Sequence, residues 1–167
     1  GKYVMPKNFL VLFITVLFIS CKSDDDSIDL NCAAVLCAAV DDTIYLQFLN
    51  PENDADLLSD ESIDANLIEI VNQKNQEIAF TVEEYPNMGT FLAIPVSTES
   101  FGQKSFTIDF DESDSFTVDF ETSFSEGGEC CGPYTIVERF DIDNYSYELM
   151  EPSQLPVFSK VYITNLN

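Results

Sequence analysis

Apolar and polar residues alternate along most of the chain from residue 43 onward, and turn-forming residues interrupt the alternation about every ten positions. Because successive side chains in a strand point to opposite faces, this period predicts half-buried β-strands. Short strands at this spacing predict an all-β fold with little helix, an antiparallel β-sandwich of immunoglobulin-like or similar arrangement. The predicted strands number about nine, at residues 43–49, 66–71, 77–82, 90–96, 104–110, 115–124, 134–141, 145–150 and 157–164.

The clearest local prediction is a β-hairpin over residues 105–120. Apolar residues share one face of its two strands, and polar residues share the other. Cross-strand aromatic and β-branched pairs stabilise such a hairpin by about 0.2 to 1 kcal/mol each, so its register is well determined. The apolar face comprises Phe106, Ile108, Phe110, Phe116, Val118 and Phe120, and the solvated face comprises Thr107, Asp109, Thr117 and Asp119.

The charge balance excludes several classes of function. The 167 residues include 30 Asp or Glu against 7 Lys or Arg, a formal charge of −23, with no His and no Trp. Nucleic acids bind proteins largely through Lys and Arg, so we expect no nucleic-acid partner. The lack of His excludes Ser-His and Cys-His catalysis and His-ligated metals.

The N-terminal segment has the pattern of a secretory signal peptide. Lys2 and Lys7 precede an apolar run at residues 9–19 that only Thr15 interrupts. A helix of that length reaches about 16 Å, well short of the ~30 Å hydrocarbon layer of a membrane. We therefore interpret residues 1–20 as a signal peptide rather than a transmembrane helix.

The apolar run ends in Leu17-Phe18-Ile19-Ser20-Cys21, which resembles the lipobox of bacterial lipoproteins. The resemblance implies that Cys21 becomes a lipidated N-terminus, and each buried CH₂ of its acyl chains adds about 0.8 kcal/mol of membrane affinity. Phe18 departs from the lipobox pattern, which prefers Leu at that position. The alternative is a free or disulfide-bonded Cys21 after ordinary cleavage.

The residues after Cys21 are Lys22, Ser23, Asp24, Asp25 and Asp26. They resemble the surface-export signal of Bacteroidota lipoproteins, in which Lys or Ser precedes an acidic cluster. The resemblance implies an outer-membrane protein, attached by its lipid and facing the cell exterior. The same charges also suit a solvated, extended tether, and the two interpretations are compatible.

Four cysteines remain in the body of the chain, an even number that predicts disulfides in an oxidising compartment. Neighbouring residues of a strand point to opposite faces, so Cys130 and Cys131 bond more readily to different partners than to each other. We expect two long-range bridges to Cys32 and Cys37, with the pairing left open. A zinc or redox site is disfavoured, because Cys-x4-Cys with an adjacent Cys-Cys lacks the usual zinc-ligand spacing.

The chain therefore divides into a signal peptide at residues 1–20, a lipidated Cys and flexible acidic tether at 21–31, and a disulfide-stapled β-sandwich domain at 32–167. The lipobox, the tether, Cys-x4-Cys and the late Cys-Cys-Gly together resemble small surface lipoproteins of Bacteroidota. The resemblance implies an extracytoplasmic β domain, and the group has no common activity to carry over.

Acidic side chains suggest two kinds of chemistry. Ca²⁺ binds six to eight oxygen ligands, which an acidic cluster around the hairpin or a second acidic turn could supply, although EF-hand spacing is missing. Paired carboxylates could instead hydrolyse glycosides, although no apolar pocket or Trp is evident beside them. Charged turns and solvated faces explain these residues without either role: Asp109, Asp111, Glu112, Asp114, Asp119 and Glu121, then Glu52, Asp54 and Asp56.

Other residues suggest binding or modification. Tyrosine suits surfaces that meet a protein or a glycan, although it is also common on half-buried sheet faces, and four tyrosines lie late in the chain. Asp-Ser-Ile and Asp-Thr-Ile resemble the O-glycosylation signal of the same bacterial group and make Ser27 and Thr43 candidate acceptors. The four tyrosines are Tyr134, Tyr145, Tyr147 and Tyr162.

We hypothesise a non-enzymatic surface lipoprotein without a cofactor that acts as a binding or accessory module. Its predicted partners are the membrane through the lipid, and an outer-membrane transporter, another surface complex or a glycan. The alternatives are a Ca²⁺-dependent structural or adhesive domain and a carbohydrate-active enzyme.

Overall fold

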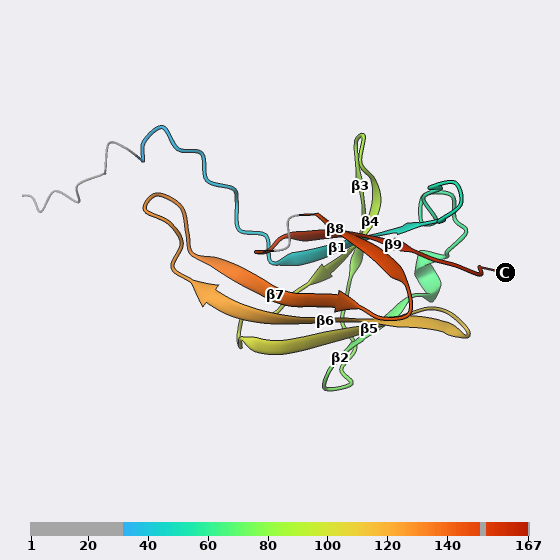
Figure 1. Cartoon of the computed structure of the whole chain (residues 1–167). Coiled ribbons are helices and arrows are strands. Elements are labelled where there is room, and N and C mark those ends of the chain that lie inside the picture. Colours follow the sequence, from blue (N-terminus) through green and yellow to red (C-terminus); the bar gives the residue numbers. More distant parts are fainter. Residues whose placement is uncertain (1–31, 151–152, 167) are drawn as a thin grey trace, which may run out of the picture. The chain divides into compact units, whose positions relative to one another are not determined.

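Nine β-strands in two sheets form the part of the chain that the computed structural model describes, residues 32–150 and 153–166 (Figure 1). The first sheet has the order β3-β4-β1-β9-β8 and the second has the order β2-β5-β6-β7. The strands are β1 (Thr43–Leu49), β2 (Glu69–Asn72), β3 (Thr81–Tyr85), β4 (Gly89–Pro95), β5 (Gly102–Asp111), β6 (Asp114–Ser125), β7 (Tyr134–Ile142), β8 (Ser146–Met150) and β9 (Val157–Tyr162).

The two sheets pack face to face around one hydrophobic core. Phe48 of β1 lies 5.8 Å from Phe116 and 6.0 Å from Phe110, ring centroid to ring centroid, across the layer between the sheets. Alternate residues of each strand supply the core, as period-two patterning requires. The predicted all-β sandwich of about nine strands is confirmed.

The β5–β6 hairpin forms as the pattern predicts. Phe106 pairs with Val118 and Ile108 with Phe116, and these side chains are buried in the core. On the opposite face, Thr107 and Thr117 are directly paired and their hydroxyl oxygens lie 3.4 Å apart. The outer face of the second sheet is therefore polar here.

One pairing departs from the predicted antiparallel arrangement. β1 and β9 run parallel, from Ile44 opposite Val157 to Leu49 opposite Tyr162. Parallel strands need a long connection, and here the pair joins the first strand to the last. Alternating residues show that a segment is a strand, but they do not show which distant strand it pairs with.

Most strand boundaries differ from the prediction by one or two residues, but β2 and β3 begin three and four residues later than predicted. Residues 65–67 form a 3₁₀ helix, η2 (Ala65–Leu67), whose preceding Asp64 accepts a hydrogen bond from the backbone N–H of Asn66, so β2 begins only at Glu69. β3 begins at Thr81 because Ile78 still donates a backbone hydrogen bond to Ile70 of the second sheet. Residues 79 and 80 then cross to the first sheet.

Disulfides close the end of the sandwich where β1 begins. Cys37, six residues before β1, is bonded to Cys131 in the β6–β7 connection, with 5.4 Å between the two Cα atoms. Cys32 and Cys130 are each in a disulfide as well. The prediction that the four cysteines form disulfides is confirmed, and residues 37–167 make up one compact unit.

Several predicted features lie outside the described residues. They are the signal peptide, the lipidation site Cys21, the export residues Lys22, Ser23, Asp24, Asp25 and Asp26, and the glycosylation candidate Ser27. Within residues 32–150 and 153–166, no helix is long and apolar enough to cross a bilayer.

Candidate functional site

Four aromatic rings pack together on the face of the first sheet that points away from the second sheet. Tyr45 stacks on Phe158 at 4.5 Å between ring centroids, and Tyr85 and Phe91 meet these two rings edge-on at 5.6 to 6.4 Å. Tyr45 and Phe91 are only 5% and 1% exposed. These four residues, which we name the outer aromatic cluster, form a second small core outside the sandwich.

Acidic side chains hold the tyrosines of the outer aromatic cluster. The Tyr45 hydroxyl donates a 2.7 Å hydrogen bond to Asp41, and the Tyr85 hydroxyl donates one of 2.7 Å to Glu83. Burial, with the hydrogen bonds to Tyr85 and Asp41, raises the pKa of Tyr45 well above its ordinary value. The two tyrosines are thus held by ring packing and by a hydrogen bond from each hydroxyl.

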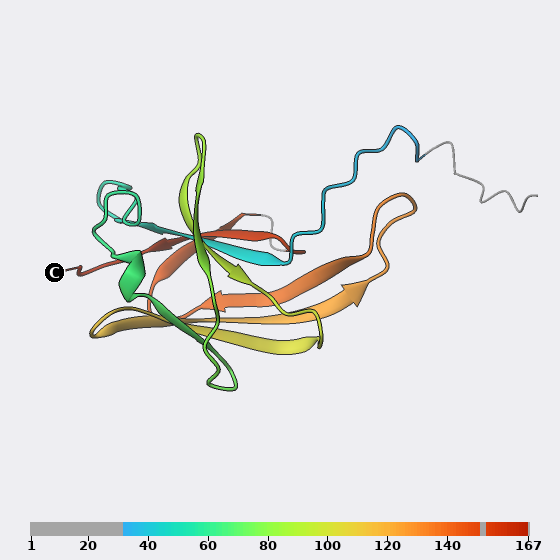
Figure 2. The ribbon, with the colours of Figure 1, turned by 180° about the vertical axis from the view of Figure 1, so that it is seen from behind.

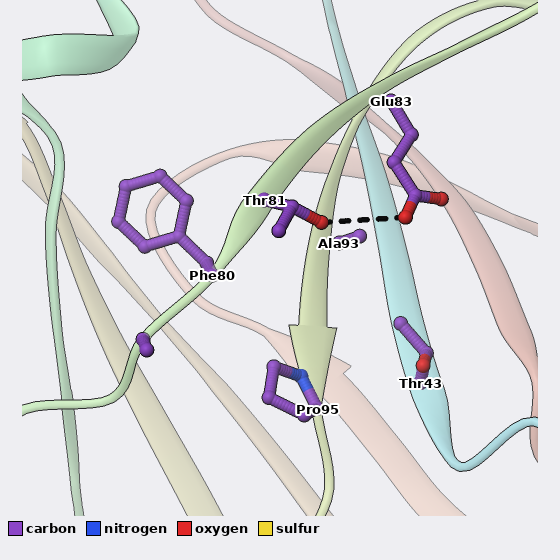
Figure 3. A pocket seen from close by; sticks show the side chains of 7 residues that line it. Thr43, Phe80, Thr81, Glu83, Ala93 and Pro95 are labelled. Atoms are coloured by element: carbon purple, nitrogen blue, oxygen red, sulfur yellow. Dashed lines mark hydrogen bonds between the residues drawn. The ribbon is translucent and has the colours of Figure 1, made fainter.

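A hollow of about 300 Å³ lies beside this cluster, at the ends of β1 and β4. Figure 3 shows Phe80 on one side of the hollow and Thr43 on the other, with Pro95 between them and Ala93 behind. Thr81 donates a 3.3 Å hydrogen bond to Glu83 at the upper rim. The walls are mostly apolar, although the hollow opens on the outside of the sandwich.

A second hollow, of about 350 Å³, adjoins the first, because Ala79 and Pro95 line both. Its other walls include Ile78, Val96 and Phe106. We name the two hollows together the crossover groove, after the segment 77–80 that passes between the sheets beside them. The groove offers apolar surface on both sides of this segment.

Lys104 of β5 places an ammonium group on the crossover groove. Its side chain is partly buried, and burial, followed by the nearby charge of Lys74, lowers its pKa. The ion pair found among the described residues joins Arg139 to Glu121 at 2.9 Å. Lys104 forms no ion pair with any described residue. The groove thus combines apolar walls, hydroxyl groups, the carboxylates of Glu77 and Glu83, and a lysine that forms no ion pair among the described residues.

The acidic cluster of the hairpin divides between two places. Asp109, Asp111, Glu112 and Asp114 line a hollow of about 490 Å³ with Glu69, whereas Glu121 faces Arg139. In the part of the chain that the structure describes, no three side chains of metal-ligating type lie close enough together to hold a metal ion.

Asp56, in the second acidic turn, has a structural role. One carboxylate oxygen accepts hydrogen bonds from the Gln47 side chain at 3.1 Å and the Thr90 backbone N–H at 2.8 Å, and the other accepts from Ser59 at 3.2 Å. These contacts tie the β3–β4 hairpin to β1. Gly89, at a φ of 112°, lies against the same two side chains, where a Cβ would collide with Gln47 and Asp56.

The four late tyrosines are half-buried rather than exposed, and two of them pack on the core. Tyr145 contacts Phe110 and Phe116, and Tyr147 contacts Phe140. Tyr162 donates a 3.2 Å hydrogen bond to Glu148 on the outer face, and Tyr134 lines a separate hollow. They do not form a row of exposed rings.

The glycosylation candidate Thr43 begins β1 and lines the first hollow, so a glycan on its hydroxyl would occupy that end of the crossover groove.

Sequence patterning missed the outer aromatic cluster and the groove. One signal for the groove was present, because Lys104 is in phase with Phe106, Ile108 and Phe110 on the core side of β5. A lysine in the apolar phase of a strand indicates an unusual site or an open end of the core.

Comparison of the chain with protein-family models, curated proteins and solved structures finds no match.

Proposed function

We propose that this protein is a non-enzymatic binding module held at the outer-membrane surface by lipid on Cys21. In this proposal the acidic tether over residues 21–31 carries the β-sandwich outward, and the crossover groove binds a ligand or a segment of a partner in a surface complex. The lipobox and the acidic residues after it support the anchor, as do disulfides typical of proteins outside the cytoplasm.

The crossover groove is the observation that carries the binding part of this proposal. The outer faces of antiparallel sheets are usually polar, because water covers them. Here Phe80, Ala93 and Pro95 instead leave an apolar hollow beside a packed aromatic cluster. Ligand sites in proteins are commonly concave and apolar with a few polar groups, which is the composition of this groove.

The binding part is tested by filling the groove. Ala79 is exposed and lies in the wall that both hollows share, so Ala79→Phe narrows each of them without disturbing the core. Ala38→Phe is the matched control, because Ala38 is also exposed but does not line the groove. Whole cells that produce each variant are chemically cross-linked, and the partners are identified by mass spectrometry.

We expect Ala79→Phe to lose a partner or ligand that the native chain and Ala38→Phe both retain. Identical cross-linked species in the three proteins would contradict binding through the groove.

The anchor is tested separately with Cys21→Ser. We expect the native chain to carry acyl chains in its intact mass and to sediment with membranes, whereas Cys21→Ser stays in the soluble fraction. A native chain without added lipid mass would refute the anchor and leave the groove experiment unaffected.

A further inference from the structure

The charge distribution around the crossover groove is unusual for this chain. With 30 acidic residues against 7 basic ones, a carboxylate partner for any lysine is easily available. Among residues 32–150 and 153–166, Lys104 nevertheless pairs with no carboxylate, although Glu77 lines the same hollow. Burial lowers the pKa of Lys104, and the positive charge of Lys74 lowers it further.

The fold brings these two lysines together through an ordered turn between β2 and β3. The Asn72 side-chain oxygen accepts hydrogen bonds from the backbone N–H groups of Lys74 at 2.9 Å and Gln76 at 3.0 Å. Gln73 accepts a 3.2 Å hydrogen bond from the backbone N–H of Ser105, the neighbour of Lys104. The turn is thereby fixed against β5, which keeps two positive charges beside each other.

Apolar residues line the same hollow as Lys104. Ile78, Ala79, Pro95, Val96 and Phe106 line the same hollow, and the hollow adjoins the one formed by Phe80 and Ala93. An unpaired cation at the edge of an apolar groove is complementary to a molecule that has an anionic head and an apolar body.

We infer that the crossover groove binds an amphiphilic anion, with its carboxylate or a similar acidic group on Lys104 and its apolar body along Ile78, Ala79 and Pro95. This inference rests on the proposed function, because it names the class of ligand for the same groove. Lys74 does not line the groove, but its charge acts on Lys104 and lowers the pKa of that lysine.

A purely structural role for Lys104 makes a different prediction. A lysine can pack its aliphatic stem on Phe106 and hold its ammonium group in water without binding anything. In that case a change from Lys to Met, which keeps an unbranched apolar side chain, would leave ligand binding unchanged.

The test uses three probes that share one apolar body. They are 4-phenylbutyrate, the uncharged 4-phenylbutan-1-ol and the cationic 4-phenylbutylamine, each titrated into the ¹⁵N-labelled full-length chain at pH 6.5, well below the ordinary pKa of lysine. Backbone amide shifts of Ala79, Val96 and Lys104 report binding in the groove. Each titration is repeated with Lys104→Met and with Lys160→Met, a control on the outer face of β9 that also lacks an ion pair among the described residues.

We expect 4-phenylbutyrate to bind at least tenfold more tightly than the alcohol, and the amine to bind most weakly. Lys104→Met should weaken 4-phenylbutyrate about tenfold and leave the alcohol unchanged, since a hydrogen bond to a charged group contributes this much or more. Lys160→Met should bind all three probes as the native chain does.

The outcomes separate the two proposals. Equal binding of the acid and the alcohol, or no effect of Lys104→Met, would overturn the inference that the ligand is an anion. The proposal that the groove binds apolar ligands would still stand. No shift at Ala79, Val96 and Lys104 with any probe would count against binding in the groove altogether.

Discussion

The outer faces of the two sheets differ in what they expose to water. In the second sheet, β5 and β6 present a paired Thr107 and Thr117 beside exposed Asp109 and Asp119, as expected for a solvated face. In the first sheet, the outer aromatic cluster lies on the corresponding side, and Phe91 is only 1% exposed. One sandwich thus has a polar outer layer and an apolar one.

The difference follows from how the strands bend. The β3–β4 hairpin rises away from the second sheet, as both views show, so the first sheet curves at that end (Figures 1 and 2). The curvature brings Tyr85 of β3 within 6.3 Å of Phe158 on β9, ring centroid to ring centroid, although two strands lie between them. A flat sheet would leave these rings apart and in water. The apolar outer layer is therefore a product of sheet curvature.

The strongest test of this comparison removes a ring from the outer aromatic cluster. We expect Phe91→Ala to lower the free energy of unfolding by about 4 kcal/mol, the usual cost of truncating a fully buried Phe. Thr107→Ala, on the outer face of the second sheet, should cost below about 1 kcal/mol. Chemical denaturation with the disulfides intact measures both. A small loss for Phe91→Ala would show that the cluster does not act as a second core.

A second test concerns the contacts that hold the β3–β4 hairpin. Gly89→Ala should destabilise the fold by about 2 to 3 kcal/mol, because a Cβ collides with Gln47 and Asp56 at a positive φ. Gly102, at a φ of 118°, has no neighbour within 4 Å of such a Cβ, so Gly102→Ala should cost only about 1 kcal/mol. Equal losses in thermal or urea unfolding would mean that backbone strain alone matters at both glycines.

A third test uses alkaline pH. An unfolded chain releases the Tyr45 proton near pH 10, whereas in the folded chain burial raises the pKa of Tyr45. The contribution of Tyr45 to the free energy of unfolding is therefore complete below pH 10. Above pH 10 it falls by about 1.4 kcal/mol for each pH unit, until the pKa of the folded state is reached. Tyr45→Phe should remove this part of the pH dependence of the free energy of unfolding, which urea titrations between pH 9 and 11 measure. An unchanged slope would contradict burial of the hydroxyl.

The smallest expected effect is at the surface of the second sheet. Arg139 pairs with Glu121 at 2.9 Å, but three quarters of the Arg139 side chain is exposed. We expect Arg139→Met to change the free energy of unfolding by about 0.5 kcal/mol or less, since exposed ion pairs contribute little. A loss above about 1.5 kcal/mol in the same urea assay would mean that this face is more than a solvated layer.

The local pattern predicted those parts of the fold that depend on neighbours in sequence. The bounds of β1, and the shared buried face of Phe106 and Val118 in the β5–β6 hairpin, follow from alternation. The register that pairs these two residues was not predicted. The parallel pairing of β1 with β9 depends on the packing of distant segments, which alternation does not encode.

The candidate site was harder to predict for the same reason. Ile44, Tyr45 and Leu46 form a run of buried residues, which is typical of a strand covered on both faces, but the rings that cover Tyr45 come from β3, β4 and β9. Only the order of the strands in the sheet shows that Tyr85 and Phe158 contact Tyr45. Lys104 was visible as a cation in the apolar phase of β5, whereas its position beside Lys74 depends on the turn before β3.

The bond between Cys37 and Cys131 also determines how the domain responds to mechanical load. A force applied at residue 37 does not act on β1 alone, because Cys131 lies in the connection between β6 and β7 of the other sheet. The tension is shared by both layers, so β1 is not peeled from β4 and β9 one hydrogen bond at a time. Any strong pull on that end of the domain must instead shear the two layers together.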